Sequence, residues 1–330
     1  MSSFRAYRVR KEGDTVRGRL ENITLADLAP GAVVLRVEYS GINFKDALGP
    51  TGRGRIQRRF PLVVGIDLAG TVESSESSRF RAGDKVFANG CDLGEKIDGG
   101  FAERARVPAE ILMPLPEGLD SLAAMTLGTA GFTAALARHR MEALGQSPAQ
   151  GKILVTGASG GVGAVAVDLF ASGGYDVVAV SGKPAARAFL EKRGATEILS
   201  PADLKLGEAP LERPRWAGAI DNVGGELLSG ILRHIDLWGN VASIGLAGGA
   251  EYRGTVMPHI LRGVSILGIS SNNCPMPLRE ALWKKLASEW RPKELDSLRT
   301  QIVGLDGLEA AFQALLGRNI IGRVVVDCQK

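Results

Sequence analysis

The segment from Ile153 to Val167 constrains the fold more than any other part of the chain. An apolar, β-prone run at 153–155 gives way to four glycines within seven residues, after which apolar residues resume at helical spacing. Glycines permit a tight turn from strand to helix, and the free N–H groups at the start of the helix attract an anion. The turn has the order Ala-x-Gly-x-x-Gly, one alanine away from the dinucleotide-binding fingerprint. The predicted phosphate-binding residues are therefore Ala158, Ser159, Gly160, Gly161, Val162 and Gly163.

A second strand is predicted at 176–180, and the residues after it indicate which dinucleotide binds. Folds that bind NAD carry an acidic residue at about this distance, which holds the ribose 2′-hydroxyl. This chain has Ser181, Gly182 and Lys183 there, with Arg187 further along. A hydroxyl, a backbone N–H and two cations suit a 2′-phosphate, so the predicted cofactor is NADPH.

The same turn fits a second interpretation. Gly157-x-Ser159-x-Gly161 matches the nucleophile elbow of serine hydrolases, which also lies between a strand and a helix. A hydrolase would also need an acid and a histidine further along the chain. The candidates are Asp221, Asp236, His234 and His259. No spacing favours that assignment, so it stays a minor alternative. A nucleotide triphosphatase loop is excluded because Ala164 occupies the position where lysine is required.

Composition places the chain among ordinary globular proteins. Its 330 residues are 45% hydrophobic and 23% charged, enough for two domains with their own cores. The three cysteines form no CxxC pair, which favours a reducing, cytoplasmic setting. The first residues lack the apolar core of a signal peptide, and no apolar stretch is long enough to span a bilayer. A net charge of +4 with 5% aromatic residues argues against nucleic-acid binding.

Turn signals divide the chain into two kinds of structure. Short strands at 33–39, 62–72 and 85–88 predict an antiparallel, barrel-like domain. From about Ser121 a helical segment leads into alternating strands and helices, which predict a parallel sheet covered on both faces. Those elements are expected at 153–156, 161–172, 176–180, 184–193, 216–221, 224–233, 239–244 and 264–268. The tail, with helices at 279–290 and 308–316 and a strand at 323–326, is expected to rejoin the first domain.

Several short strings extend the pattern over almost the whole chain. They are Gly41-Ile42-Asn43-Phe44-Lys45-Asp46, Gly65-Ile66-Asp67-Leu68-Ala69-Gly70, Gly99-Gly100-Phe101-Ala102-Glu103, Gly128-Thr129-Ala130-Gly131 and Asp221-Asn222-Val223-Gly224. In order and spacing they resemble the medium-chain dehydrogenase/reductase superfamily. Ser181-Gly182-Lys183, Gly245–Gly249 and Thr255–Arg262 are similar to its zinc-free quinone oxidoreductase branch, which contains NADPH-dependent acrylyl-CoA reductases.

This resemblance implies an α/β protein with two domains. A GroES-like β-barrel catalytic domain, residues 1–122 and 271–330, would enclose an inserted Rossmann domain with a doubly wound parallel sheet, residues 123–270. The active site would lie in the cleft between them. The edge strand at 264–269 would pair with a second copy, so a homodimer is expected.

The zinc ligands of the superfamily's alcohol dehydrogenases have no counterparts here, so no metal is predicted. Asn43 stands where a zinc-binding cysteine is expected, and Gly65-Ile66-Asp67 replaces Gly-His-Glu. Without a Lewis acid, reduction of an activated C=C bond is the more plausible chemistry. The predicted reaction is acryloyl-CoA to propionyl-CoA, with hydride delivered to the β-carbon. NADPH-dependent quinone reduction is the main alternative, and a non-catalytic NADPH sensor is a minor one.

The family also implies roles for individual residues. Asn43 would hydrogen-bond near the nicotinamide or the substrate carbonyl, although Asx residues also close turns. Phe44 would stack near the nicotinamide, and it lacks the hydroxyl of the tyrosine common in near relatives. Thr129 would contact the ring, with helix capping as the ordinary alternative. For Asp46 a structural role is favoured. Further NADP contacts are implied for Leu246, Ile260 and Ser271.

An arginine-rich stretch directly follows the expected active-site turn. Its cations are Arg53, Arg55, Arg58 and Arg59, and no acidic residue lies between Asp46 and Asp67. Such a run is usually a solvated surface. Because of its position, we also expect it to hold phosphate groups of a CoA ester or of NADPH.

Overall fold

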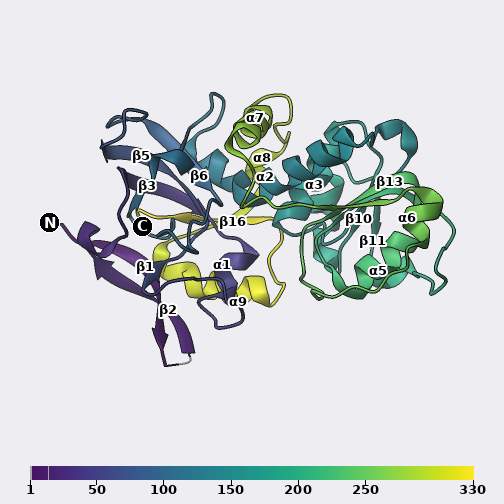
Figure 1. Cartoon of the computed structure of the whole chain (residues 1–330), viewed down its shortest axis with the longest axis horizontal. Coiled ribbons are helices and arrows are strands. Elements are labelled where there is room, and N and C mark those ends of the chain that lie inside the picture. The colour runs from purple at the N-terminus through teal and green to yellow at the C-terminus, as the bar shows by residue number, and fades with distance from the viewer. Residues whose placement is uncertain (1, 14) are drawn as a thin grey trace. The chain divides into compact units, whose positions relative to one another are not determined.

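The computed structural model describes residues 2–13 and 15–330 and divides the chain into two compact units (Figure 1). The first unit comprises the residues up to Thr129, with Asn272–Ala287 and Leu295–Lys330. The second comprises Ala130–Ser271 and Ser288–Glu294. None of the described helices combines the length and the apolar character needed to cross a membrane.

The second unit contains a six-stranded sheet in the order β11-β10-β9-β12-β13-β14, with every neighbouring pair parallel. Its strands are β9 (Ile153–Val155), β10 (Val177–Val180), β11 (Glu197–Leu199), β12 (Trp216–Asp221), β13 (Ile235–Ser243) and β14 (Ser265–Gly268). Counted along the chain this is the order 3-2-1-4-5-6 of a Rossmann sheet, in which ligands bind beyond the carboxyl ends of the strands. The connecting helices include α3 (Gly161–Ser172), α4 (Arg187–Glu191), α5 (Gly225–Arg233) and α6 (Met257–Arg262).

The first unit is built from two sheets, with a large hydrophobic core and a second, smaller apolar cluster. The larger sheet has the order β15-β16-β3-β5-β6-β8, with β7 also paired to β3, and the smaller has the order β2-β1-β4. The strands are β1 (Phe4–Glu12), β2 (Thr15–Ile23), β3 (Val33–Gly41), β4 (Leu62–Val63), β5 (Asp67–Ser75), β6 (Lys85–Asn89), β7 (Arg104–Val107), β8 (Met113–Pro114), β15 (Arg299–Val303) and β16 (Arg323–Asp327). The helices are α1 (Phe44–Leu48), α7 (Met276–Ala287), α8 (Leu295–Leu298) and α9 (Leu308–Leu316).

Segments that precede and follow the second unit in the sequence meet in the larger sheet. Strand β16 pairs antiparallel with β3, so that Val325 lies opposite Gly41. The C-terminal tail therefore lies in the first unit, except for Ser288–Glu294. Domain boundaries after residues 122 and 270 stay a prediction. Helix α2 (Ser121–Ala143) begins in the first unit and is interrupted at Gly128, which has φ +51° and ψ −154°.

Some predicted elements were wrong. The single strand expected at 62–72 is two strands in different sheets, because the chain turns at Gly65, where φ is +103°. A Cβ on Gly65 would lie 2.8 Å from the backbone nitrogen of Phe101, so a larger residue would not fit. The helix expected at 279–290 covers Met276–Ala287, and the one expected at 184–193 is a short 3₁₀ turn followed by α4. The hairpin of β1 and β2 was not predicted.

Candidate active site

The glycine-rich turn of the second unit is shaped by close backbone packing. Gly157 has φ +57°, and the N–H of Ala158 donates to the carbonyl of Val180 (3.0 Å), which fixes the turn to β10. A Cβ on Gly163 would lie only 2.4 Å from the Gly157 carbonyl oxygen. Since Cβ atoms do not approach oxygen so closely, only glycine fits at 163. The turn leaves Gly160, Gly161 and Val162 half-buried at the start of α3, where a phosphate-binding turn presents its N–H groups.

The polar residues predicted to choose the cofactor come together beside this turn. The Ser181 hydroxyl donates to Ser159 Oγ (2.9 Å), and the Lys183 N–H donates to Ser181 Oγ (3.2 Å). Burial lowers the pKa of the Lys183 ammonium. A negative ligand group would compensate this partly buried cation. Arg187, further along on α4, lies 3.5 Å from Glu191 in an exposed ion pair.

The residues that the structure describes form no hydrolase triad. Ser159 contacts Ser181, whereas the carboxylate of Asp221 accepts hydrogen bonds from Thr156 (2.8 Å) and the Gly224 N–H (2.8 Å). The ring nitrogens Nδ1 of His234 and His259 lie against the backbone carbonyls of Arg213 and Val264. Among the described residues, no histidine or carboxylate is hydrogen-bonded to Ser159, so this alternative lacks its base.

Other residues with implied cofactor roles are distributed over both units. Leu246 and Ile260 are 58% and 71% exposed in the second unit, so core packing does not explain either of them. Ser271 is the last residue of that unit before the chain returns to the first. Phe44 belongs to the first unit, where it opens α1 and is 37% exposed.

A buried ionic cluster lies in the first unit around Asn43. This residue caps α1, and its backbone N–H donates to the Asp46 carboxylate (2.8 Å). Its side-chain amide donates to Asp67 Oδ2 (2.7 Å), and its side-chain oxygen accepts from the Arg323 guanidinium (3.2 Å). Asn43 therefore closes a turn, as one of its two expected roles required, and it also joins two charged groups; its contact with the nicotinamide or the substrate carbonyl stays a prediction.

Asp67 is the centre of this cluster. It is fully buried and accepts from both the backbone N–H (3.0 Å) and the hydroxyl (2.6 Å) of Thr129. The Arg323 guanidinium lies 3.8 Å away. Asp67 can approach α2 so closely because residue 128, where the helix is interrupted, is glycine: a Cβ there would lie 2.5 Å from Asp67 Oδ2. Thr129 is thus held by Asp67, a contact that neither of its expected roles included.

The electrostatics of the cluster are those of two carboxylates and one cation out of contact with water. Burial, and then the neighbouring charge of Asp67, raise the pKa of Asp46 to about 7. Burial also raises the pKa of Asp67, opposed first by the Arg323 charge and then by hydrogen bonds from Thr129 and Asn43. The two carboxyls differ in their charged neighbours: Asp67 lies 3.8 Å from the Arg323 guanidinium, whereas the charge of Asp67 itself adds to the rise at Asp46.

Arg323 was missed in the sequence prediction. It begins the buried strand β16, is 3% exposed, and donates to the carbonyls of Thr126 (3.0 Å) and Ile42 (2.8 Å). A charged residue at the start of an apolar strand run was the available signal. Its partners lie some 200 to 280 positions earlier in the chain, so no local pattern points to them.

The arginine-rich stretch divides into one structural and three exposed residues. Arg59 donates to Asp98 (2.5 Å), which is buried and also accepts from the N–H groups of Ala29 and Val63. Arg59 is therefore a structural residue of the first unit. Arg53, Arg55 and Arg58 are exposed, and none of them forms an ion pair with a described carboxylate.

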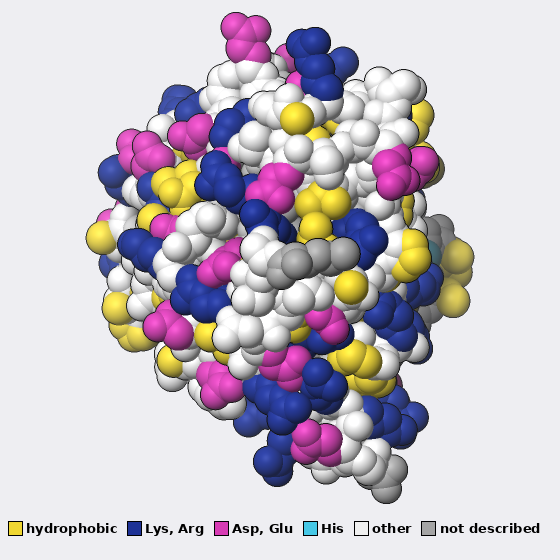
Figure 2. All heavy atoms as spheres, turned by 90° about the vertical axis from the view of Figure 1, so that its left-hand side faces the viewer, with side chains coloured by type: hydrophobic (Ala, Val, Ile, Leu, Met, Phe, Trp, Pro, Cys, Tyr) yellow, Lys and Arg dark blue, Asp and Glu magenta, His cyan; other side chains and the backbone are white. Residues whose placement is uncertain are grey.

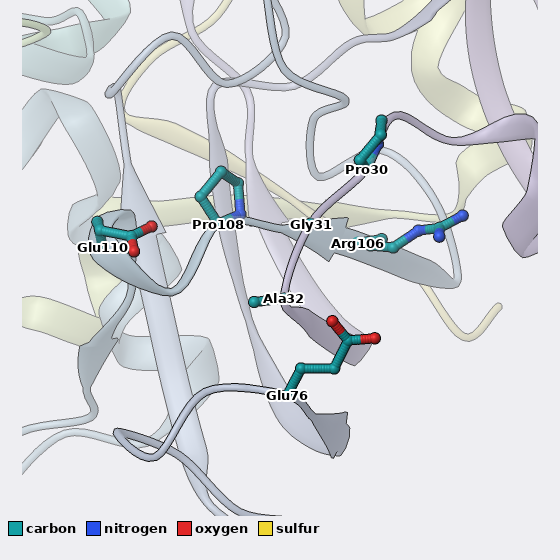
Figure 3. Close-up of a pocket in the computed structure, with 7 residues that line it drawn as sticks. All are labelled: Pro30, Gly31, Ala32, Glu76, Arg106, Pro108 and Glu110. Atoms are coloured by element: carbon teal, nitrogen blue, oxygen red, sulfur yellow. The ribbon is translucent and has the colours of Figure 1, made fainter.

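A surface pocket of about 440 Å³ lies elsewhere in the first unit (Figure 3). Its charged side chains are Glu76, Arg106 and Glu110, beside Pro30 and Pro108. Arg106 donates to the backbone carbonyls of Leu25 and Leu28, which fastens the strand to a neighbouring turn. No predicted site residue lines this pocket, and it is not part of the candidate site.

Comparison with known proteins agrees with this fold. Residues 29–117 match the family model of the alcohol dehydrogenase GroES-like domain, and residues 161–288 match that of the zinc-binding dehydrogenases. The chain is 45% identical over 324 residues, 98% of each protein, to the Bacillus subtilis protein named quinone oxidoreductase YhfP. It is 42% identical over 320 residues, 96% of each, to acrylyl-CoA reductase AcuI of Ruegeria pomeroyi.

Solved structures of relatives give the same result. The crystal structure of Escherichia coli YhdH with NADPH has a TM-score of 0.94 at 40% identity and covers 98% of this chain and 99% of its own. The structure of YhfP with NAD bound has a TM-score of 0.95 at 45% identity and covers 99% and 100%. Fold and matched models together define an oxidoreductase with a GroES-like domain and a Rossmann domain. The chain belongs to the medium-chain dehydrogenase/reductase family, among the relatives named quinone oxidoreductase and acrylyl-CoA reductase.

The donor set of the cluster does not fit the zinc ion that one of these models implies by name. It offers an amide and two carboxylates, without thiolate or imidazole. The oxygens of Asp67 already accept from Asn43 and Thr129, and the positive charge beside them is Arg323. The dinucleotide, in contrast, fits the turn at Gly157–Gly163, where the backbone is packed so closely that Gly163 has no room for a Cβ.

Proposed function

We propose that this protein uses NADPH, without zinc, to reduce the C=C bond of a small α,β-unsaturated thioester, converting acryloyl-CoA to propionyl-CoA. The observation that carries the proposal is the cluster of Asn43, Asp67 and Arg323. Its amide and carboxylate do not suit zinc, and the positive charge beside them is the buried guanidinium of Arg323. The 42% identity to an acrylyl-CoA reductase supports the substrate class.

Held by the turn at Gly157–Gly163 and by Ser181 and Lys183, NADPH would supply a hydride for the β-carbon, with the C=C electrons moving onto the thioester carbonyl as an enolate. A proton then adds to the α-carbon, and the carbonyl re-forms. The role that we assign to Asp67 is to hold Asn43 and Thr129 in fixed positions, since it accepts from the Asn43 amide and from the N–H and hydroxyl of Thr129. Asp46, which takes up a proton near neutral pH, keeps the cluster from carrying excess negative charge.

NADPH is proposed over NADH because of the group formed by Ser159, Ser181 and Lys183. A hydroxyl pair and a partly buried ammonium suit the 2′-phosphate, and no acidic residue follows β10 directly. The relative YhdH was crystallised with NADPH, which supports this choice, although YhfP was crystallised with NAD. Competition between the two cofactors is therefore a direct test.

The exposed arginines are proposed to hold phosphate groups of the CoA ester. A Cβ on Gly52 would lie 3.8 Å from the Val16 carbonyl, so this loop runs beside the β1–β2 hairpin. Figure 2 views the molecule from the left-hand side of Figure 1. It shows lysine and arginine side chains gathered at the lower end of the molecule, where the β1–β2 hairpin lies. Bidentate arginine contacts to phosphate would position the small acryloyl group by binding the remote part of the substrate.

Quinone reduction is the second candidate function, because the relative at 45% identity is named quinone oxidoreductase. NADPH oxidation should be followed with acryloyl-CoA, a truncated acryloyl thioester, crotonyl-CoA and a benzoquinone. The proposal requires the highest kcat/KM for acryloyl-CoA, lowered when Arg53, Arg55 or Arg58 becomes alanine. Arg81→Ala, at a 91% exposed side chain outside the loop, is the matched control. A benzoquinone used as well as acryloyl-CoA would contradict the CoA assignment.

The protein is further proposed to act as a cytoplasmic homodimer. Strand β14 ends the sheet of the second unit, leaving one edge unpaired in this chain. Trp238 is 73% exposed. It lies close to β14, because a Cβ on Gly263, just before that strand, would be 2.8 Å from its indole. Pairing of two such edges would cover both features.

A further inference from the structure

The β1–β2 hairpin, labelled in Figure 1, carries a row of arginines on one face. Its antiparallel register places Arg8 opposite Arg19 and Arg10 opposite Arg17. The two pairs are two positions apart on each strand, so all four guanidiniums project from the same face. Val9, between Arg8 and Arg10, belongs to the hydrophobic core and marks the other face. Like charges directly opposite each other destabilise a strand pair unless other charges balance them.

Three of these four arginines share one carboxylate. Glu21 accepts from the Nε groups of Arg10 (2.7 Å) and Arg19 (2.7 Å), and the Arg8 guanidinium lies 3.7 Å from it. Hydrogen bonds from Arg10, and then from Arg19, lower the pKa of Glu21 to about 2 against the effect of burial. Arg17 is exposed and forms no ion pair with a carboxylate in the described part of the chain. Its guanidinium is therefore available to an anionic ligand.

The arginine-rich loop after α1 runs beside this hairpin. It approaches β2 at Gly52, where a Cβ would lie 3.8 Å from the Val16 carbonyl oxygen. The Thr51 hydroxyl donates to a backbone carbonyl of α1 (2.6 Å), and the buried Gln57 amide donates to a backbone carbonyl of the turn after β6 (3.1 Å). The exposed Arg53 lies between these two anchors. The loop thus holds its arginines beside a hairpin that has exposed arginines of its own.

This order of parts matches the order of groups in a CoA thioester. Such a thioester has its acyl group at one end, a diphosphate in the middle and a 3′-phosphate on the ribose at the other end. Asn43 and Phe44, at the start of α1, belong to the candidate site; the loop follows α1, and the hairpin lies beside the loop. Guanidinium groups bind phosphate oxygens bidentately. Two separate groups of arginines therefore suit two separate phosphate groups.

We propose, resting on the function proposed above, that the hairpin binds the 3′-phosphate of CoA through Arg17, while the loop arginines bind the diphosphate. Arg17 is then a specificity residue, which favours CoA thioesters over those of pantetheine or 3′-dephospho-CoA. The bound phosphate also balances the like charges of Arg10 and Arg17. Binding this remote group helps to position the small acryloyl group.

The test compares acryloyl-CoA with acryloyl-3′-dephospho-CoA in the parent protein and in Arg17→Ala. The parent should prefer acryloyl-CoA in kcat/KM by about tenfold, the lower end for a hydrogen bond to a charged group. Arg17→Ala should use both thioesters equally and keep the parent's KM for NADPH. Lys11→Ala is the matched control, because it removes one exposed positive charge from the other face of the same hairpin. It should keep the tenfold preference.

Direct binding separates this site from the reaction. Calorimetric titrations with CoA and 3′-dephospho-CoA should show the same preference in the parent and its loss in Arg17→Ala. If acryloyl-CoA is not reduced at all, the proposed function fails, whereas these titrations still decide on the site. A parent that binds both compounds equally, or an Arg17→Ala variant that keeps the preference, would overturn the site. So would an equal loss in Lys11→Ala, since the effect would then come from net charge.

Discussion

Replacing Arg323 by methionine tests whether charge or hydrogen bonding holds the candidate site together. The substitution keeps a long side chain but leaves Asp67 buried without its cation. Removing one partner of a buried ion pair costs about 3–5 kcal/mol. Arg323 also donates hydrogen bonds to Ile42, Thr126 and Asn43, and at about 0.5–1.5 kcal/mol each these could account for a similar loss. The size of the effect alone therefore does not decide the cause.

The double variant with Asp67→Asn separates the two causes. If charge dominates, removing the carboxylate as well should recover about half of the lost stability at pH 8. The Asn43 amide, no longer facing Arg323, can then turn its oxygen toward the new amide. The single variant should also lose less at pH 5 than at pH 8, because a buried carboxylate without a cation takes up a proton. The assay is urea unfolding followed by circular dichroism. A double variant no more stable than the single one, at both pH values, would refute the argument from charge.

Four further outcomes are expected. Lys183→Ala should weaken NADPH binding by about 1.5–3 kcal/mol, roughly 10- to 150-fold, and leave NADH binding unchanged; equal losses in titrations with both would contradict the 2′-phosphate role. Dialysis against a chelator should leave the NADPH-dependent rate unchanged, and a rate lost and restored by added zinc would disprove zinc independence. Burial raises the pKa of Asp46 to about 7, so the contribution of Asp46 to stability should be complete below about pH 4 and be lost as the pH rises to 7. The urea midpoint of Asp46→Asn should not show this decline between about pH 4 and 7. A midpoint that falls with pH as steeply as in the parent protein would exclude Asp46 as the source of the decline. Trp238→Glu should convert a dimer to monomer in sedimentation, whereas a native monomer would disprove the edge pairing.

The nucleotide half of the protein was largely determined by local sequence. Strand β9, helix α3 and strand β12 begin where the glycine spacing and apolar runs predicted, to within a residue. Glycine at 163 is required by a contact with Gly157, only six positions earlier, so a short motif contains both partners. Likewise, Ser159, Ser181 and Lys183 are joined by one parallel strand pair, and the βαβ pattern is enough to bring them together.

The first unit, with its buried ionic cluster, was decided by tertiary structure. Asn43 and Asp67 were recognised as replacements for metal ligands, but the cation that faces them, Arg323, comes from the last strand of the chain. The break at Gly65 depends on the backbone of Phe101, and the role of Thr129 depends on the kink at Gly128. Each is a contact between segments far apart in sequence, and hydrophobic periodicity reports which face of an element is buried but not which partner it meets. The sequence by itself determined the dinucleotide turn and the absence of zinc ligands, whereas the pairing of β16 with β3 decided how the buried charges are balanced.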